Sequence, residues 1–309
     1  MKQWALILLA VSSLVLTACG GAPAAQNSAA QSYATITDDS GRTVTFDKKP
    51  ERIVVTSASF IAPLYAVGGE VVGRPATKSK VIPAAEGAAT IGPVYQIDAE
   101  KILALSPDLV IINKGMNEKL IETLAANNIQ TLVIEMKSYE DVKREVTTFA
   151  ALTGEKAKGE ELIAKMDADI DAVRASIPQE KKRISIIHST GQGLSVQLDG
   201  SIAGSIAKML GWENTASGMP ALDKNPDAAP YSMETLVAQN PDIIFVTSMG
   251  EEAEIRASME AMFAGSPAWQ SVSAVRDGRV YYLPQELFLF SPGIQYPEAV
   301  KYMARLIYP

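Results

Sequence analysis

The sequence predicts an α/β protein with two similar lobes, each built on a mainly parallel sheet, joined by one long helix. Three observations support this fold class. Short apolar strands alternate with helical stretches in two successive series, part of the first series recurs in the second, and one long amphipathic stretch separates them. A chain of 309 residues also has the length of two domains of about 150 residues each.

The N-terminus has the pattern of an export signal. A positively charged start precedes an uncharged, mostly apolar run, Trp4–Leu16, which is shorter than the roughly 20 residues of a membrane-spanning helix. The next tetrad, Leu16–Cys19, resembles the lipobox of bacterial lipoproteins, in which the cysteine is lipidated and becomes the first residue after cleavage. We therefore expect a lipoprotein signal peptide at 1–18, a lipid on Cys19 and a flexible tether at 19–32, with an ordinary signal peptide as the alternative. The expected location is extracytoplasmic, anchored to the bacterial membrane.

The N-terminal lobe is expected at residues 33–153. Two alternating segments around the polar turn Asp38–Gly41 predict a β-hairpin. The short unalternating strands that follow, separated by helices, indicate a parallel sheet covered on both faces. The strands are expected at 33–37, 42–46, 53–55, 109–112 and 131–134, and the helices at 60–67, 99–105, 117–127 and 139–152.

One long helix is expected to connect the lobes. Residues 155–177 carry apolar side chains at a spacing near 3.6, and Pro178 follows as a stop signal. At about 1.5 Å per residue this stretch spans about 34 Å, enough to cross from one domain to the other, although a helix packed on a single sheet has the same pattern. We place the connecting helix at 154–178 and the C-terminal lobe at 179–309.

The C-terminal lobe repeats the order of the first. Ile97–Ile112 aligns without a gap on Tyr231–Val246, and the Glu, Ala, Pro and Asp residues of the first segment recur in the second. Each copy indicates a helix N-cap (Asp98, Ser232), a short helix, a Pro-Asp turn and a buried strand. In this lobe a hairpin is expected around 191–200, strands at 184–187, 243–246 and 280–283, and helices at 201–210, 232–238, 253–262 and 297–307.

The composition excludes several classes of function. One cysteine and one histidine rule out nearly all zinc sites and any disulfide within the chain. The 28 basic and 35 acidic residues give a net charge of -7, so a nucleic acid is not an expected partner. Motifs of common enzyme classes, such as G-x-S-x-G, H-E-x-x-H and G-x-G-x-x-G, do not occur. We expect neither an enzyme nor an intrinsic cofactor.

The motifs together resemble the helical-backbone class of substrate-binding proteins of ABC importers, which bind ferric siderophores, haem or cobalamin. The resemblance covers nearly the whole chain after the signal peptide. It implies a ligand cleft between the lobes, a small hinge motion, a monomer, and delivery to a permease dimer with a cytoplasmic ATPase. The motifs that carry it are the Asp39–Arg42 turn, the Pro50–Val54 strand entry, the two Pro-Asp repeats, and Trp269 followed by Ala274–Tyr281.

The resemblance also implies permease-docking residues. In this family one surface glutamate per lobe docks on arginines of the permease, and the matching positions are Glu100 and Glu234. Both fall in the first turn of an expected helix, where the helix dipole favours a carboxylate by about 0.3–1 kcal/mol without any docking role. Docking, unlike this local effect, requires both carboxylates to face one partner.

The expected cleft residues follow the carboxyl ends of the strands, where parallel sheets bind ligands. They mix aromatic, thioether, hydroxyl and lysine groups, which suits a bulky, partly apolar, anionic ligand. They are Thr56, Ser57, Ser59, Tyr95, Lys114, Met116, Lys137, His188, Tyr231, Met249 and Phe288.

Three classes of ligand stay open. Tyr95 and His188 are candidate ligands of haem iron, and the resemblance implies a tyrosine ligand close to Tyr95 in the haem-binding branch; alternatively, Tyr95 only lines the cleft and His188 is a hydrogen-bonded core residue. A ferric siderophore needs no protein ligand to iron, but a catecholate complex needs positive charge, for which the candidates are Arg74, Lys78, Lys80, Lys114 and Lys137. Cobalamin is the third class. A bare metal ion is not expected, because the cluster of His and carboxylate ligands is missing. A surface adhesin or sensor without a permease is the rival function.

Overall fold

The structure is a computed structural model that describes residues 32–77, 81–191, 193–249 and 252–309. The expected signal peptide, the lipidation site Cys19 and all of the expected tether except Ser32 lie outside the described residues. None of the helices in these ranges combines the length and the apolar character that a membrane crossing requires.

The N-terminal lobe contains a five-stranded sheet in which all neighbouring strands are parallel. The central strands are buried almost completely, as the run of apolar residues predicts for a sheet covered on both faces. The strand order is β5-β4-β3-β6-β7, with β3 at Ile53–Val55, β4 at Val71–Ala76, β5 at Ala89–Pro93, β6 at Leu109–Asn113 and β7 at Gln130–Ile134.

The other elements of this lobe match the expected ones closely. The predicted hairpin is present as the antiparallel pair β1 and β2. The sequence pattern does not predict β4 and β5, because β4 contains Gly73, Arg74 and Pro75 and buries only alternate residues. The hairpin and helices are β1 (Ala34–Thr37), β2 (Thr43–Phe46), α1 (Ile61–Ala66), α2 (Ala99–Ala104), α3 (Ile121–Ala126) and α4 (Tyr139–Thr153).

The C-terminal lobe has a mixed sheet of order β11-β9-β8-β12-β13, with β10 beside the start of β8. The pairs of β8 with β10 and β12, and of β12 with β13, are parallel, whereas β9 is antiparallel to both of its neighbours. The strands are β8 (Arg183–Thr190), β9 (Gly193–Gln197), β10 (Glu213–Asn214), β11 (Ala228–Pro230), β12 (Ile243–Ser248) and β13 (Val280–Tyr282). The helices are α6 (Ile202–Met209), α7 (Met233–Gln239), α8 (Glu252–Phe263), α9 (Pro267–Ser271), α10 (Ser273–Arg276) and α11 (Gln285–Phe288).

The two Pro-Asp turns do the same structural work in both lobes. The Asp108 carboxylate accepts a hydrogen bond of 2.9 Å from the backbone N–H of Arg52, at the entry to β3. The Asp242 carboxylate accepts one of 3.0 Å from the backbone N–H of Arg183, at the start of β8. Each aspartate therefore ties the beginning of one strand to the beginning of its neighbour.

The helices before these turns also correspond. Asp98 and Ser232 cap α2 and α7 with their side chains, as expected. Ser106 and Asn240, the aligned residues that follow the two helices, both adopt left-handed backbone conformations, with φ of 45° and 42°. A left-handed residue ends a helix, so the sequence repeat is a repeat of backbone conformation as well.

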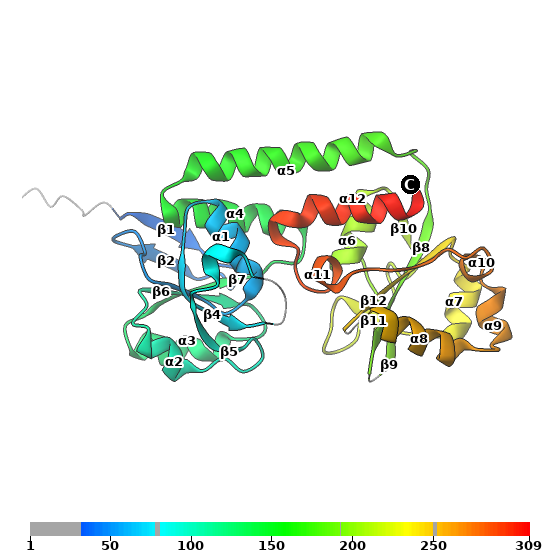
Figure 1. The fold of residues 1–309 in the computed structure, drawn as a ribbon, viewed down its shortest axis with the longest axis horizontal. Helices are drawn as coiled ribbons and strands as arrows, with labels where there is room; N and C mark the ends of the chain where they lie inside the picture. Colours follow the sequence, from blue (N-terminus) through cyan, green and yellow to red (C-terminus); the bar gives the residue numbers. More distant parts are fainter. Residues whose placement is uncertain (1–31, 78–80, 192, 250–251) are drawn as a thin grey trace, which may run out of the picture. The chain divides into compact units, whose positions relative to one another are not determined.

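Two helices link the lobes. The predicted long helix is α5 (Lys156–Ser176), and α12 (Tyr296–Ile307) packs along it (Figure 1). Met166 of α5 and Val300 of α12 belong to one hydrophobic core that includes buried residues of both sheets. The expected fold class is confirmed, and α12 is a second link that the sequence pattern did not indicate.

Tyr296, at the start of α12, contacts both lobes. Its ring centroid lies 5.3 Å from that of Tyr139 in α4, and its hydroxyl lies 3.1 Å from the Ser205 hydroxyl of α6. The residue is fully buried, and burial raises the pKa of its phenol to about 12. Because one aromatic side chain packs on elements of both lobes, a large rotation of one lobe against the other would break this contact.

Glu145 is a buried carboxyl group in α4. Its side chain is 1% exposed, and its two oxygens accept no hydrogen bond from any described residue. Burial raises the pKa of Glu145 well above its usual value, and Asp39 and Asp141 add to the effect while Arg144 opposes it. The group is therefore neutral in the folded protein at pH values at which the unfolded chain ionises it.

This difference makes the stability of the fold depend on pH. The contribution of Glu145 is fully present below its unfolded pKa of about 4.3 and is lost as the pH rises, by up to about 1.4 kcal/mol per unit, until the folded pKa is passed. We expect Glu145→Gln to unfold with a shallower pH dependence than the wild type above pH 5, measured by urea titration. Glu140→Gln, on the exposed side of the same helix, is the control and should keep the wild-type slope. Equal slopes for wild type and Glu145→Gln would contradict the assignment.

Candidate ligand-binding site

Asp38 anchors the hairpin turn to the sheet. Its carboxylate is buried, pairs with Arg42 at 2.6 Å and accepts a hydrogen bond of 3.1 Å from the backbone N–H of Val133 in β7. Burial alone would raise the pKa of Asp38, but the hydrogen bonds from Arg42, Ser40 and Val133 outweigh it and lower the pKa. The turn motif therefore fixes β7, the strand that leads to the candidate site.

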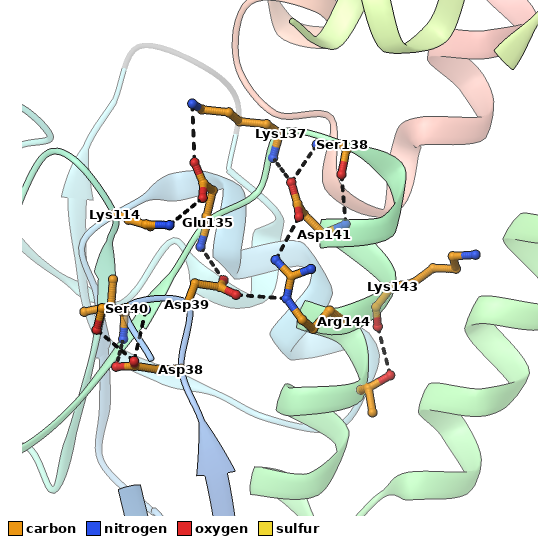
Figure 2. A network of polar contacts seen from close by, with 12 residues as sticks. Asp38, Asp39, Ser40, Lys114, Glu135, Lys137, Ser138, Asp141, Lys143 and Arg144 are labelled. Carbon is orange, nitrogen blue, oxygen red and sulfur yellow. Dashed lines mark hydrogen bonds and ion pairs between the residues drawn. The ribbon is translucent and has the colours of Figure 1, made fainter. Parts of the chain in front are cut away.

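Asp39 holds the loop that follows β7 (Figure 2). Its carboxylate accepts hydrogen bonds from the backbone N–H of Glu135, at 2.7 Å, and from the Arg144 guanidinium, at 2.9 Å. Arg144 also pairs with Asp141 at 2.8 Å, and Asp141 forms a capping box with Ser138 at the start of α4. The backbone of this loop is thus fixed from the hairpin and from α4.

Two lysines meet one glutamate on this loop (Figure 2). Lys114 Nζ, from the end of β6, lies 2.8 Å from a Glu135 oxygen, and Lys137 Nζ lies 3.3 Å from the other. The hydrogen bond from Lys114 lowers the pKa of Glu135 despite its partial burial. The side chains of Lys114 and Lys137 are 36% and 46% exposed, so both lysines are accessible to a ligand at the carboxyl ends of β6 and β7.

Tyr95 stands on a tight loop after β5 and is 74% exposed. Gly92, near the end of β5, has φ of 102°, and a Cβ there would lie 2.6 Å from the carbonyl oxygen of Gln96 in the loop, so only glycine fits. The buried Asn117 donates a hydrogen bond of 2.9 Å from its amide to the Val94 carbonyl. Sequence reasoning selected Tyr95 but missed Asn117, because its partner is visible only in the folded chain.

The polar residues after β3 serve mainly the backbone. Thr56 is fully buried, and its hydroxyl accepts a hydrogen bond of 2.8 Å from the backbone N–H of Asn113, which joins the ends of β3 and β6. Ser57 is the N-cap of a short 3-10 helix at Ala58–Phe60, and its hydroxyl accepts a hydrogen bond from the backbone N–H of Ser59. Ser57 and Ser59 remain partly exposed and can contact a ligand.

His188 lies inside β8 and not at its end, which corrects the expected boundary of that strand. Its Nδ1 is 3.0 Å from the Thr247 hydroxyl of β12, and burial lowers its pKa, so the ring is neutral at pH 7. These contacts match a hydrogen-bonded strand histidine. Tyr231 is also half-buried, with a hydroxyl 3.7 Å from Met233 Sδ and a pKa raised by burial to about 12.

Phe288 does not present its ring to a ligand. It is 1% exposed in α11 and packs against Tyr302 at a centroid distance of 6.0 Å, so its side chain belongs to the hydrophobic core. Phe290, two residues further, is 43% exposed. The exposed aromatic side chain of this segment is thus Phe290.

Exposed apolar side chains occur after strand ends in both lobes. Tyr95 and Met116 follow β5 and β6, and Met249 follows β12 at 64% exposure. Phe290, which follows α11, is a further exposed apolar side chain of the C-terminal lobe. Exposed apolar groups with charged neighbours are typical of ligand or partner sites.

A groove of about 660 Å³ lies elsewhere, between α5 and α12. It is lined by apolar residues such as Leu162 and Ile177 and by charged ones such as Lys301. None of the candidate cleft residues lines it. We therefore base the ligand-binding site on the strand ends and not on this groove.

The protein has two lobes on largely parallel sheets, and packed helices link them. Side chains that can contact a ligand lie at the strand ends. These features define a two-lobed solute-binding protein. The chain belongs to the periplasmic binding protein family, whose sequence profile matches residues 53–287. Members of this family bind solutes and are not enzymes.

Several of the similar proteins are named for the binding of an iron compound. The chain is 25% identical to the Fe(3+)-citrate-binding protein YfmC of Bacillus subtilis, with 96% of each chain covered. It is 28% identical to the iron(3+)-hydroxamate-binding protein FhuD of the same organism, with 94% of this chain and 91% of that one covered. Among solved structures, IsdE of Staphylococcus aureus complexed with heme has a TM-score of 0.72 at 20% identity, over 84% of this chain and 99% of that one.

Glu100 and Glu234 are exposed in the first turns of α2 and α7. Because these helices are the two copies of the sequence repeat, the glutamates occupy equivalent places on the two lobes. Within the described part of the chain neither forms an ion pair at 4.0 Å or less. Both carboxylates are thus available to a partner.

The Tyr95 loop provides a test of the site. Gly92→Ala should lower the free energy of unfolding by about 1–3 kcal/mol and weaken ligand binding, because the new Cβ meets the Gln96 carbonyl at a positive φ. Gly87→Ala is the control, since its Cβ would meet nothing within 4 Å. The measurements are chemical denaturation and ligand titration. Equal effects of the two substitutions would show that the loop does not need its glycine.

Proposed function

We propose that this protein is the substrate-binding lipoprotein of an ABC importer that captures an iron complex, a ferric siderophore or haem, and delivers it to a membrane permease. The observation that carries the proposal is the combination of exposed apolar side chains (Tyr95, Met116, Met249) with the exposed lysines Lys114 and Lys137 at the strand ends. Such a surface suits a ligand that is bulky, partly apolar and anionic.

The described residues favour a ligand that brings its own iron coordination. They contain no group of three or more His, Cys, Asp or Glu side chains placed to hold a metal ion. The two lysines fit an anionic ferric chelate, which needs charge but no protein ligand to the iron. This favours a ferric siderophore or ferric carboxylate as the leading ligand.

Haem is the second candidate because of Tyr95. Its phenol is exposed and held on a rigid loop, and a tyrosine oxygen is an established type of haem-iron ligand. His188 is the weaker candidate, because it lies within β8 and its ring is partly buried. We propose Tyr95 as the iron ligand if haem is the cargo.

The membrane attachment belongs to the same proposal. A lipid on Cys19 would anchor the protein, and residues 20–32 would tether it near the permease. Glu100 and Glu234 would then dock the two lobes on the permease.

A titration of the mature protein distinguishes the ligands. Ferric citrate, ferric catecholate and trishydroxamate chelates, haemin and cobalamin are added in turn, and binding is followed by tryptophan fluorescence and absorbance. We expect micromolar or tighter binding of an anionic ferric chelate. If haem is the cargo, haemin produces a shifted Soret band that Tyr95→Ala removes. Failure of every iron complex to bind would contradict the proposed function.

Docking is tested by reversing charge. Glu100→Lys combined with Glu234→Lys should abolish uptake by cells and leave ligand affinity unchanged, because both residues lie outside the candidate site. Glu298→Lys, in the first turn of α12, is the matched control for loss of a helix-dipole interaction and should transport normally. Normal uptake by the double variant would favour a surface binding or sensor protein over an importer component.

A further inference from the structure

We infer that Lys137 binds an anionic group of the ligand and that Asp227, from the other lobe, occupies Lys137 until the ligand replaces it. The inference deepens the proposed function and depends on it. It rests on an ion pair of 3.0 Å between Lys137 Nζ and the Asp227 carboxylate, which joins the loop after β7 to the segment before β11.

Asp227 is the nearer of two carboxylates at Lys137. Glu135, in the same loop, lies 3.3 Å away and already receives a hydrogen bond of 2.8 Å from Lys114. Among the described residues of its own lobe, Lys137 pairs only with Glu135, a carboxylate that Lys114 also contacts. Without Asp227, the nearest carboxylate to both lysines is that of Glu135.

The Lys137 side chain can change partners without a movement of its backbone. The backbone N–H of Lys137 donates to the Asp141 carboxylate at 3.2 Å, and the capping box of Ser138 fixes the next residue. The side chain is 46% exposed. The ammonium group stands at the end of a flexible aliphatic chain, while the backbone is fixed. It can therefore exchange one carboxylate for another at little cost in free energy.

Asp227 is placed to make this contact by its own lobe. Its backbone carbonyl accepts a hydrogen bond from the Leu198 N–H, and its backbone N–H donates to the Asn225 side chain at 3.1 Å. Gly200 leaves room for the carboxylate, since a Cβ there would lie 2.6 Å from Asp227 Oδ1. The segment therefore presents a carboxylate at a defined position across from the lysines.

This arrangement selects ligands by charge. An anionic group that reaches Lys137 takes the place of Asp227 and balances the positive charge of the Lys137 ammonium in its stead. A neutral ligand either leaves the ion pair intact or separates it without compensation. The proposed ligand class is therefore a ferric chelate with a free or delocalised negative charge, such as a carboxylate or catecholate complex, which binds more tightly than a neutral trishydroxamate.

The test measures the affinity of four proteins for two probes, ferric citrate and a neutral ferric trishydroxamate. Asp227→Asn removes the competing carboxylate and should bind ferric citrate about two- to fivefold more tightly than the wild type, the range expected for an exposed ion pair. Lys137→Gln removes the anion-binding group and should bind ferric citrate at least about tenfold more weakly. Asp223→Asn, on the same segment, removes the same charge without this ion pair and should match the wild type. The neutral probe should bind the four proteins alike.

The outcomes separate the inference from the proposed function. If the wild type binds an iron complex and Asp227→Asn matches Asp223→Asn for ferric citrate, the exchange is wrong and the function stands. Equal losses for both probes in Lys137→Gln would also overturn it. Gly200→Ala, which displaces the carboxylate without removing it, should behave as Asp227→Asn, and thermal melts identify any variant that fails to fold. If the wild type binds no iron complex at all, the proposed function itself fails.

Discussion

The hydrophobic core shared by the two lobes constrains every motion that ligand binding can use. Burying one large apolar side chain stabilises a fold by about 1.5–3 kcal/mol, and Tyr296, Val300 and Met303 of α12 are all fully buried between elements of both lobes. An exposed ion pair such as that of Lys137 and Asp227 contributes about 0–1 kcal/mol. The ion pair between Lys137 and Asp227 therefore breaks much more easily than the packing of the core. We accordingly expect ligand binding to move side chains and loops at the strand ends.

The loops at those strand ends are fixed from beneath, which suits a site that changes little on binding. Asp38 and Asp39 tie the hairpin to β7 and to the loop after it, and Asn117 and Gly92 determine the path of the Tyr95 loop. Because the backbone of these loops is already ordered, ligand binding costs conformational entropy only at a few exposed side chains. The turn motif that contributed to the family resemblance thus stabilises the loop after β7.

The sequence predicted the elements that have a local signature and missed those that depend on distant partners. The repeated Pro-Asp turns, the caps Asp98 and Ser232 and the long helix α5 follow from short-range patterns, and the structure has all of them. The sequence did not predict β4, because its Gly and Pro residues interrupt the alternating pattern that is typical of a strand. Phe288 was expected to line the cleft and His188 to follow the end of its strand, because a short apolar run does not show where a strand ends or which ring is buried. Asp227 had no signal at all, since its partner lies in the other lobe.

Because the net charge of the chain is negative, the attraction of an anionic ligand depends on Lys114 and Lys137. At -7 the protein as a whole repels an anionic chelate, but at physiological ionic strength the Debye length is about 8 Å, so distant carboxylates are largely screened. Lys114 and Lys137 act within contact distance, where screening is weak. A lysine pair without a counter-charge would also attract small anions such as phosphate or chloride. Asp227 occupies Lys137 and therefore excludes weakly bound anions, while a chelate that gains additional apolar contacts with both lobes can displace it.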